Sequence, residues 1–137
     1  MYIMLSNPEI RMKKLSITKF IPGIAWFFIL LFIMTLPGDE IPKVDWLERI
    51  SFDKAVHIGT FALLAILFCW PLNKSGFNTK ERLGFFIKIS IAVSLWGLAI
   101  EFIQKYFVHG RSFDLLDWAA DTVGALLAYW FCRRMFK

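Results

Sequence analysis

Three groups of ionisable and polar residues lie inside or directly beside apolar segments of this sequence. They are Asp53, Lys54 and His57 in the first group, Glu101 and Gln104 in the second, and Arg111, Asp114, Asp117 and Asp121 in the third. Carboxylates combined with a histidine can transfer protons or hold a divalent cation, and a guanidinium can bind phosphate or carboxylate. A charge at the centre of a membrane helix costs roughly 2.5–3.5 kcal/mol on insertion scales, so such residues are candidates for function.

The composition predicts that these residues belong to an integral membrane protein. Hydrophobic residues make up 58% of the 137 residues, and the mean hydropathy is +0.57. Soluble domains are roughly 45–50% apolar. The 15 Phe and 6 Trp residues suit lipid-facing surfaces and interfacial belts. The length fits one domain, 1–137, of the all-α class.

Four apolar segments predict a four-helix transmembrane bundle, with helices at about 20–36, 52–70, 83–107 and 112–131. We expect Pro71 to end the second helix and Ser112 to cap the fourth. The segment 37–49 is expected to be a loop. A cleaved signal peptide is the alternative for the first segment, but no small-x-small cleavage site follows it, so a retained helix is favoured.

The basic residues predict the orientation, because Lys and Arg accumulate on the cytoplasmic side of membrane helices. One side would carry Arg11, Lys13, Lys14, Lys19, Lys74, Lys80, Arg82, Arg133, Arg134 and Lys137, and the other Lys43, Arg49, Lys105 and Arg111. Acids of the first loop, such as Asp39 and Glu40, offset the second set. We therefore predict a multi-pass protein of the cytoplasmic (inner) membrane with both termini inside. This placement accounts for the net charge of +5 without a nucleic-acid partner.

Helical spacing predicts which side chains share a face, because residues three or four apart are neighbours on a helix. The resulting stripes are Asp53, His57 and Thr60; Ser90, Ser94, Gly97, Glu101 and Gln104; and Asp114, Asp117, Asp121, Gly124 and Ala128. Small residues such as Gly97, Gly124 and Ala128 allow close packing of membrane helices. We expect a buried seam between the last three helices, with a polar cluster near the extracytoplasmic face.

Each candidate also has a purely structural interpretation. Asp114 would cap its helix and pair with Arg111, and Asp53 would pair with the basic side chains of its own helix. Asp121 would hydrogen-bond to the serines of the third helix. Arg111 and Lys105 would be interfacial anchors, and the histidine a satisfied hydrogen-bonding group.

Cys69 and Cys132 both lie within apolar segments. They have neither CxxC spacing nor a neighbouring histidine, so they predict no zinc site. We expect both to be small buried hydrophobic residues.

The charged motifs resemble the signature of the VanZ-like membrane family. The matching residues are Asp53-Lys54-x-x-His57, Glu101-x-x-Gln104, and the following Arg111, Asp114 and Asp117. The family pattern then has an Asn before a Gly, whereas this chain has Asp121 before Gly124. The family takes its name from a protein associated with resistance to the glycopeptide antibiotic teicoplanin, so the resemblance implies a role in the cell envelope rather than a known reaction.

The first functional hypothesis is a binding module for an amphipathic envelope molecule. The ligand would be a membrane lipid headgroup, a lipid-linked cell-wall precursor or a glycopeptide antibiotic. Basic side chains (Lys54, His57 and Arg111) would contact phosphate or carboxylate oxygens. Glu101, Gln104 and Asp117 would bind hydroxyls or amines, and the excess of acids disfavours a purely anionic ligand.

Two alternatives remain open. In an enzyme, Glu101, Asp117 and His57 would supply acid–base catalysis on a headgroup, and no cofactor is expected other than a divalent cation. No nucleophile elbow, HExxH motif or phosphate-binding glycine loop is present. In a structural or proton-handling role, the acids would lock the helices, but the polar stripe does not continue across the whole membrane.

Overall fold

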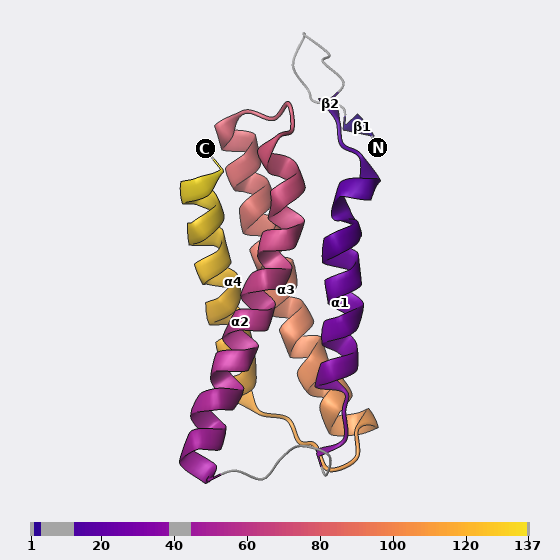
Figure 1. The fold of residues 1–137 in the computed structure, drawn as a ribbon, viewed down its shortest axis with the longest axis vertical. Coiled ribbons are helices and arrows are strands. Elements are labelled where there is room, and N and C mark those ends of the chain that lie inside the picture. The colour runs from indigo at the N-terminus through magenta and orange to yellow at the C-terminus, as the bar shows by residue number, and fades with distance from the viewer. Residues whose placement is uncertain (1, 4–12, 39–44, 137) are drawn as a thin grey trace.

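The computed structural model describes residues 2–3, 13–38 and 45–136, with side chains described at 15–38, 45 and 52–136. Its long helices are α1 (Ile21–Met34), α2 (Trp46–Asn73), α3 (Thr79–Phe107) and α4 (Leu115–Met135) (Figure 1). A short 3-10 helix, η1 (Ile17–Phe20), precedes α1, and the two-residue strands β1 (Tyr2–Ile3) and β2 (Lys13–Lys14) pair antiparallel. The prediction of a helical protein is confirmed.

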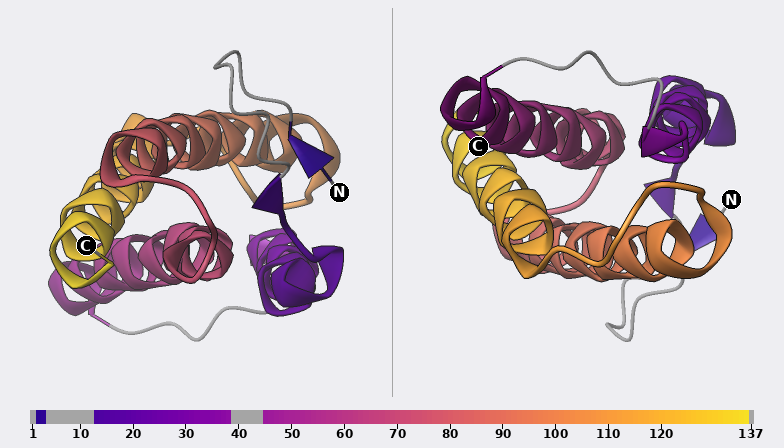
Figure 2. Two further views of the ribbon diagram at one scale, coloured as in Figure 1. Left: turned by 90° about the horizontal axis from the view of Figure 1, so that it is seen from above. Right: turned by 90° about the horizontal axis from the view of Figure 1, so that it is seen from below.

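The helix α4 packs along both α2 and α3, and these three helices make most of the contacts between elements. The end views show α1 and α4 on opposite sides of the α2–α3 pair (Figure 2). The helix α1 is attached through aromatic side chains: the Trp26 Nε1–H donates to the Thr60 carbonyl at 3.0 Å, and the Phe27 and Trp96 rings lie 4.4 Å apart. The turn between α2 and α3 and the C-terminus lie at one end of the molecule, and the α3–α4 connection lies at the other (Figure 1).

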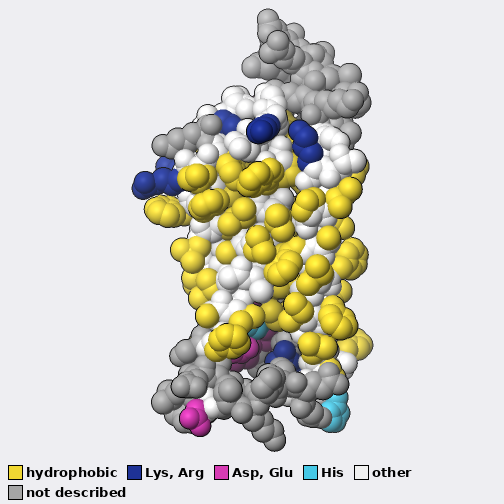
Figure 3. All heavy atoms as spheres, in the orientation of Figure 1, with side chains coloured by type: hydrophobic (Ala, Val, Ile, Leu, Met, Phe, Trp, Pro, Cys, Tyr) yellow, Lys and Arg dark blue, Asp and Glu magenta, His cyan; other side chains and the backbone are white. Residues whose placement is uncertain are grey.

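Three helical segments of the described chain are long and apolar enough to cross a membrane, namely Ile17–Met34, Phe52–Asn73 and Thr79–Phe107. The remaining long helix, α4, carries Asp117 and Asp121 within its first two turns. The 28 residues of α2 span about 42 Å at 1.5 Å per residue, longer than a hydrocarbon core of roughly 30 Å. A broad hydrophobic surface covers the middle of the molecule (Figure 3). These findings support a membrane protein.

Two glycines let the helices α2, α3 and α4 approach one another closely. A Cβ atom added to Gly124 of α4 would lie 2.4 Å from the Ile58 carbonyl oxygen of α2. A Cβ atom on Gly97 of α3 would lie 2.6 Å from the Asp121 Oδ2 of α4. Ala128 is also buried. The sequence stripes of small residues therefore lie at the contacts between α2, α3 and α4.

Away from the charged residues, the same helices pack through apolar side chains. This apolar cluster contains Leu15, Cys69, Leu72, Phe77, Phe86, Cys132 and Phe136. Both cysteines are free and fully buried, which confirms the prediction for them.

Several predicted helix boundaries were wrong. The helix α2 begins at Trp46 rather than at 52, because a helix can continue in a polar segment outside the apolar window. It also continues through Pro71 to Asn73, so the proline lies inside the helix although it removes one backbone hydrogen bond. Membrane helices tolerate such a proline because neighbouring groups can bond the freed carbonyl. The helix α1 is shorter than predicted and ends at Met34, and the Thr35 hydroxyl then donates to the Leu31 carbonyl at 2.8 Å.

The starts of the last two helices are set by capping residues. Asn78 and Glu81 form a reciprocal capping box, so α3 begins at Thr79 rather than at 83. Asp114, not Ser112, caps α4, which begins at Leu115 and ends four residues later than predicted, at Met135. The predictions for Arg11, Asp39, Glu40, Lys43 and Lys137 lie outside the described residues. The same is true of the side chains of Lys13, Lys14 and Arg49.

Candidate functional site

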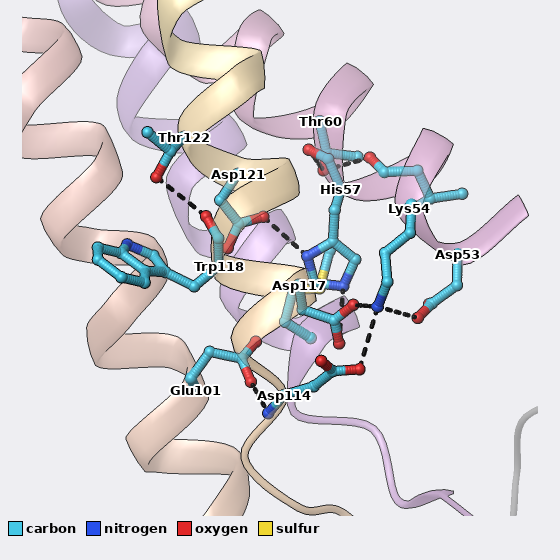
Figure 4. Close-up of polar contacts among 12 residues, drawn as sticks. Asp53, Lys54, His57, Thr60, Glu101, Asp114, Asp117, Trp118, Asp121 and Thr122 are labelled. Carbon is cyan, nitrogen blue, oxygen red and sulfur yellow. Dashed lines mark hydrogen bonds and ion pairs between the residues drawn. The ribbon is translucent and has the colours of Figure 1, made fainter. Parts of the chain in front are cut away.

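The three predicted groups of polar residues meet at the end of the molecule opposite the C-terminus. Asp53, Lys54 and His57 come from the first turns of α2 after Phe52, and Glu101 comes from the end of α3. The acids of the third group come from the start of α4. Figure 4 shows their side chains turned toward one another between the three helices.

Lys54 lies at the centre of an ion-pair network. Its ammonium donates to the Asp114 Oδ2 at 3.1 Å and to the Asp117 Oδ1, and it lies 3.8 Å from the Asp53 Oδ2. The side chain of Lys54 is 19% exposed and that of Asp117 is 9% exposed. The network joins α2 to the beginning of α4 and leaves Lys54 few positions for another partner.

One turn deeper, His57 and Asp121 form a fully buried pair. The His57 Nδ1 lies 2.7 Å from the Asp121 Oδ1, and the His57 Nε2 lies 3.8 Å from the Asp117 Oδ2. The His57 ring lies nearly parallel to the Phe61 ring, with the ring centroids 6.2 Å apart. Both ring nitrogens therefore face a carboxylate, a geometry that fixes the ring for proton transfer or metal binding.

Glu101 brings a further carboxyl group into this buried region. Its side chain is completely buried, and its Oε2 accepts a hydrogen bond from the Asp114 backbone N–H at 2.8 Å. Its Oε1 has no hydrogen-bond partner among the described residues, and the same is true of the Asp121 Oδ2. Buried polar atoms without partners are rare in folded proteins, so both oxygens are candidates for an additional ligand.

Asp114 combines capping with ion pairing. Its Oδ1 accepts from the Leu116 N–H at 2.8 Å at the start of α4. Partial burial alone would raise the pKa of Asp114, but hydrogen bonds from the Leu116 backbone and the Lys54 ammonium outweigh it and lower the pKa below its usual range. The predicted partner Arg111 is replaced by Lys54, because the Asp114 side chain faces α2.

A cavity of about 250 Å³ opens beside the Lys54 network. Its lining residues are Asp53, Lys54, Gln104, Gly110, Arg111, Ser112, Asp114 and Asp117. The Arg111 Nε is buried and has no hydrogen-bond partner among the described residues. The cavity thus offers an unused cationic donor on one side and carboxylates on the other.

Gln104 has a second task besides lining this cavity. Its Nε2 donates to the Met34 carbonyl at 2.7 Å and so ties α3 to the end of α1. The structural interpretation in which Asp121 hydrogen-bonds to the serines of the third helix is wrong, because Asp121 pairs with His57. Instead, the Ser94 hydroxyl contacts the Thr122 hydroxyl at 2.8 Å, and Ser90 donates to the Ala125 carbonyl at 3.2 Å.

The sequence analysis missed residues that complete the walls of the site. Gly110 and Ser112 line the cavity from the α3–α4 connection, and Gly110 has a positive φ of 72° that glycine adopts readily. Trp118 donates from its Nε1 to the Ser94 carbonyl at 3.0 Å and closes the α3–α4 contact. In the sequence, the glycine at position 110, between two apolar segments, was the signal that could have identified the turn between α3 and α4.

Two sets of side chains have the composition and proximity of metal ligands. One is Asp53, His57 and Asp117, and the other is His57, Glu101 and Asp121; in each, one ligand atom per residue lies within 4.8 Å of the others. Histidine nitrogen with carboxylate oxygens suits zinc and related divalent cations.

Comparison with protein families gives one finding. A family model described as VanZ/LLP1 matches residues 4–137, nearly the whole chain. No match was found among curated proteins or among solved structures. The family match confirms the resemblance that was based on the Asp53, His57 and Glu101 motifs.

Proposed function

The chain belongs to the VanZ/LLP1 family, and from this premise we propose that it is a membrane protein that binds the polar headgroup of an amphipathic envelope molecule in the cavity beside Lys54. The ligand carries an anionic phosphate or carboxylate together with an amine or hydroxyl. A zwitterionic lipid and a lipid-linked sugar precursor share this chemistry.

The observation that carries the proposal is the division of charge around the cavity. Lys54 is already bonded to Asp114 and Asp117, whereas the Arg111 Nε has no described partner. A guanidinium binds phosphate and carboxylate oxygens with directional, charge-assisted hydrogen bonds. Asp53, whose side chain is 42% exposed, faces the same cavity and can accept from an amine or hydroxyl. Arg111 would therefore bind the anionic group and Asp53 the donor group.

The distribution of charge supports a four-helix arrangement with both termini in the cytoplasm. Figure 3 shows the Lys and Arg side chains concentrated at the end that carries the C-terminus, above a hydrophobic belt. The cavity lies at the opposite end. With the positive end inside, the cavity opens on the extracytoplasmic side of the cytoplasmic membrane.

The experiment is native mass spectrometry of protein extracted gently from its membrane, with Arg111→Gln compared with wild type. We expect wild type to retain a lipid of defined mass, and Arg111→Gln to bind it at least about tenfold more weakly, since a charge-assisted hydrogen bond contributes roughly 1.5–3 kcal/mol. The retained mass distinguishes a phospholipid from a lipid-linked precursor.

Lys105→Gln is the matched control. Lys105 is exposed at the same end of α3, where its ammonium lies 5.1 Å from the Tyr106 ring centroid, and it does not line the cavity. It should retain the lipid as wild type does. Equal loss of bound lipid in both variants would show that the effect comes from surface charge rather than from the cavity. Unchanged lipid binding in Arg111→Gln would overturn the proposal.

A second candidate function is acid–base chemistry on the bound headgroup. The observation that favours it is the hydrogen-bonded pair of His57 and Asp121. The other ring nitrogen of His57 faces Asp117, which lines the cavity. A hydrolase of this kind would release a water-soluble headgroup from the retained lipid, and His57→Asn would abolish the release. If wild type binds the lipid and returns it unchanged after prolonged incubation, the binding function stands alone.

A further inference from the structure

Two buried carboxyl oxygens have no use in the proposed headgroup site. They are the Glu101 Oε1 and the Asp121 Oδ2, on side chains that are both 0% exposed, and neither has a hydrogen-bond partner among the described residues. The Asp121 Oδ2 lies against Gly97, one helical turn before Glu101 on α3. A buried carboxylate oxygen that gives up water without a replacement partner is strongly destabilising.

The carboxyl groups that carry these oxygens lie next to His57. One ligand atom from each of His57, Glu101 and Asp121 falls within 4.8 Å of the other two, and all three side chains are buried. In Figure 4 the Glu101 and Asp121 carboxyl groups approach the His57 ring from α3 and α4, respectively. Three different helices thus supply one nitrogen and two oxygen ligands to one small volume.

The charge of the region also requires compensation. The described side chains around it include five carboxyl groups, those of Asp53, Glu101, Asp114, Asp117 and Asp121, against at most three cations, those of Lys54, Arg111 and a protonated His57. With all five carboxyl groups ionised, a protonated His57 would leave two negative charges, and the neutral imidazole that a metal requires leaves three. Uncompensated charge is costly in a membrane interior, and a divalent cation on the neutral His57 reduces the excess from three negative charges to one.

We propose that His57, Glu101 and Asp121 bind a divalent transition-metal cation, with zinc as the best match to one imidazole and two carboxylate ligands. The site lies one turn deeper than the headgroup cavity and does not depend on the proposed headgroup binding. Three protein ligands leave a fourth position for water or for an oxygen of a bound molecule.

The surroundings of His57 fit this role. The Nδ1 is the ring nitrogen beside Asp121, at 2.7 Å, so a cation can replace the proton that this pair otherwise shares. The Nε2 then keeps its hydrogen and points toward the Asp117 Oδ2 at 3.8 Å. Metal-bound histidines usually direct the other ring nitrogen at a carboxylate or carbonyl, which fixes the ring.

The alternative set of Asp53, His57 and Asp117 is a poorer site. The Lys54 ammonium already binds Asp117 and lies 3.8 Å from Asp53, so it occupies the place of a cation between these carboxylates. Glu101 and Asp121 have no such basic partner on their free oxygens. The deeper set is therefore the one we assign.

The test is metal content of purified protein in detergent. The protein is stripped with a chelator, loaded with Zn²⁺, dialysed and analysed by inductively coupled plasma mass spectrometry; Co²⁺ loading gives an independent absorption spectrum of the ligand set. Wild type and Asp53→Asn should hold one cation per chain. Glu101→Gln and Asp121→Asn should bind at least about tenfold more weakly. These amides keep the shape of the acids, and circular dichroism verifies that the variants fold.

Three results would overturn the assignment. The first is wild type without stoichiometric metal after loading, and the second is unchanged metal affinity in both Glu101→Gln and Asp121→Asn. The third is metal lost in Asp53→Asn but kept in Glu101→Gln, which would place the cation in the shallower set. Arg111→Gln should keep the metal, so failure of the headgroup proposal and failure of this one are distinguishable.

Discussion

The two ends of the α2–α4 contact are built from different kinds of side chain. At one end, Lys54, His57 and Asp121 cross between the helices through ion pairs and a 2.7 Å hydrogen bond. At the other end, Cys69 and Cys132 are fully buried among aromatic and aliphatic side chains. The same two helices therefore meet through charged, directional bonds at one end and mainly through the packing of apolar side chains at the other.

This difference separates recognition from packing. An ion pair or hydrogen bond requires a specific partner at a specific distance, so the polar end can select a ligand. Apolar side chains in a membrane gain little from leaving lipid, because lipid tails are as apolar as they are, and their contribution comes mainly from close van der Waals contact. We therefore expect substitutions at the polar end to change both stability and binding, and those at the apolar end to change stability alone.

The largest effect should come from breaking the buried pair. His57→Ala leaves Asp121 buried without its partner, and loss of one member of a buried pair costs about 3–5 kcal/mol. Chemical unfolding in detergent, followed by circular dichroism, measures the change in the free energy of unfolding.

The double variant His57→Ala/Asp121→Ala sharpens this prediction. It should lose less than the sum of the two single variants, because the second substitution removes the orphaned charge. Additive losses would show that the two side chains do not stabilise one another, and the contrast between the two ends would fail.

The next effect concerns the backbone approach between the two ends. Gly124→Ala would place a Cβ atom 2.4 Å from the Ile58 carbonyl oxygen, so α4 must move away from α2. Overpacking of this kind costs about 1–3 kcal/mol. Gly59→Ala in α2 is the control, since no atom lies within 4 Å of the added Cβ, and it should unfold like wild type or later. Equal stability of the two variants would refute the close approach.

A smaller effect is expected at the apolar end. Cys69→Ala combined with Cys132→Ala removes two buried sulfur atoms without leaving an unpaired charge, and should cost about 1 kcal/mol per site. The amount of lipid retained in native mass spectrometry should equal that of wild type. Altered lipid retention would mean that the two ends are coupled rather than independent.

The smallest effect is expected for Asp114→Asn, measured by the same unfolding assay. The amide can still accept the capping hydrogen bond from Leu116, so only the ion pair with Lys54 is lost, which costs below about 1 kcal/mol for a pair that water reaches. The pKa of Asp114 is lower in the folded than in the unfolded chain, so its carboxylate stabilises the fold above the unfolded value of about 3.9. This contribution disappears as the pH falls through the folded pKa.

The difference in stability between wild type and Asp114→Asn should therefore shrink on acidification. A difference that stays constant down to low pH would exclude the ionised carboxylate as its source.

Local sequence rules predicted the elements better than their ends. Apolar length located the helices, but the capping box of Asn78 and Glu81 and the cap of Asp114 decided where α3 and α4 begin. Pro71 illustrates the same limit, because α2 continues to Asn73 although the proline removes one backbone hydrogen bond. Boundaries depend on individual hydrogen bonds, whereas an apolar window averages over many residues.

The sequence by itself determined that the chain is helical, that it belongs in a membrane and that Asp53, Glu101 and Asp117 lie toward the same end of their helices, because hydropathy and helical spacing are properties of each segment alone. Only the tertiary structure decided their partners: Lys54 rather than Arg111 pairs with Asp114, and His57 rather than a serine pairs with Asp121. It also left one oxygen each of Glu101 and Asp121 without a described partner, on carboxyl groups that lie close together. Such pairings depend on the rotation and close approach of α2, α3 and α4, which glycines such as Gly97 and Gly124 permit and which no single helix specifies.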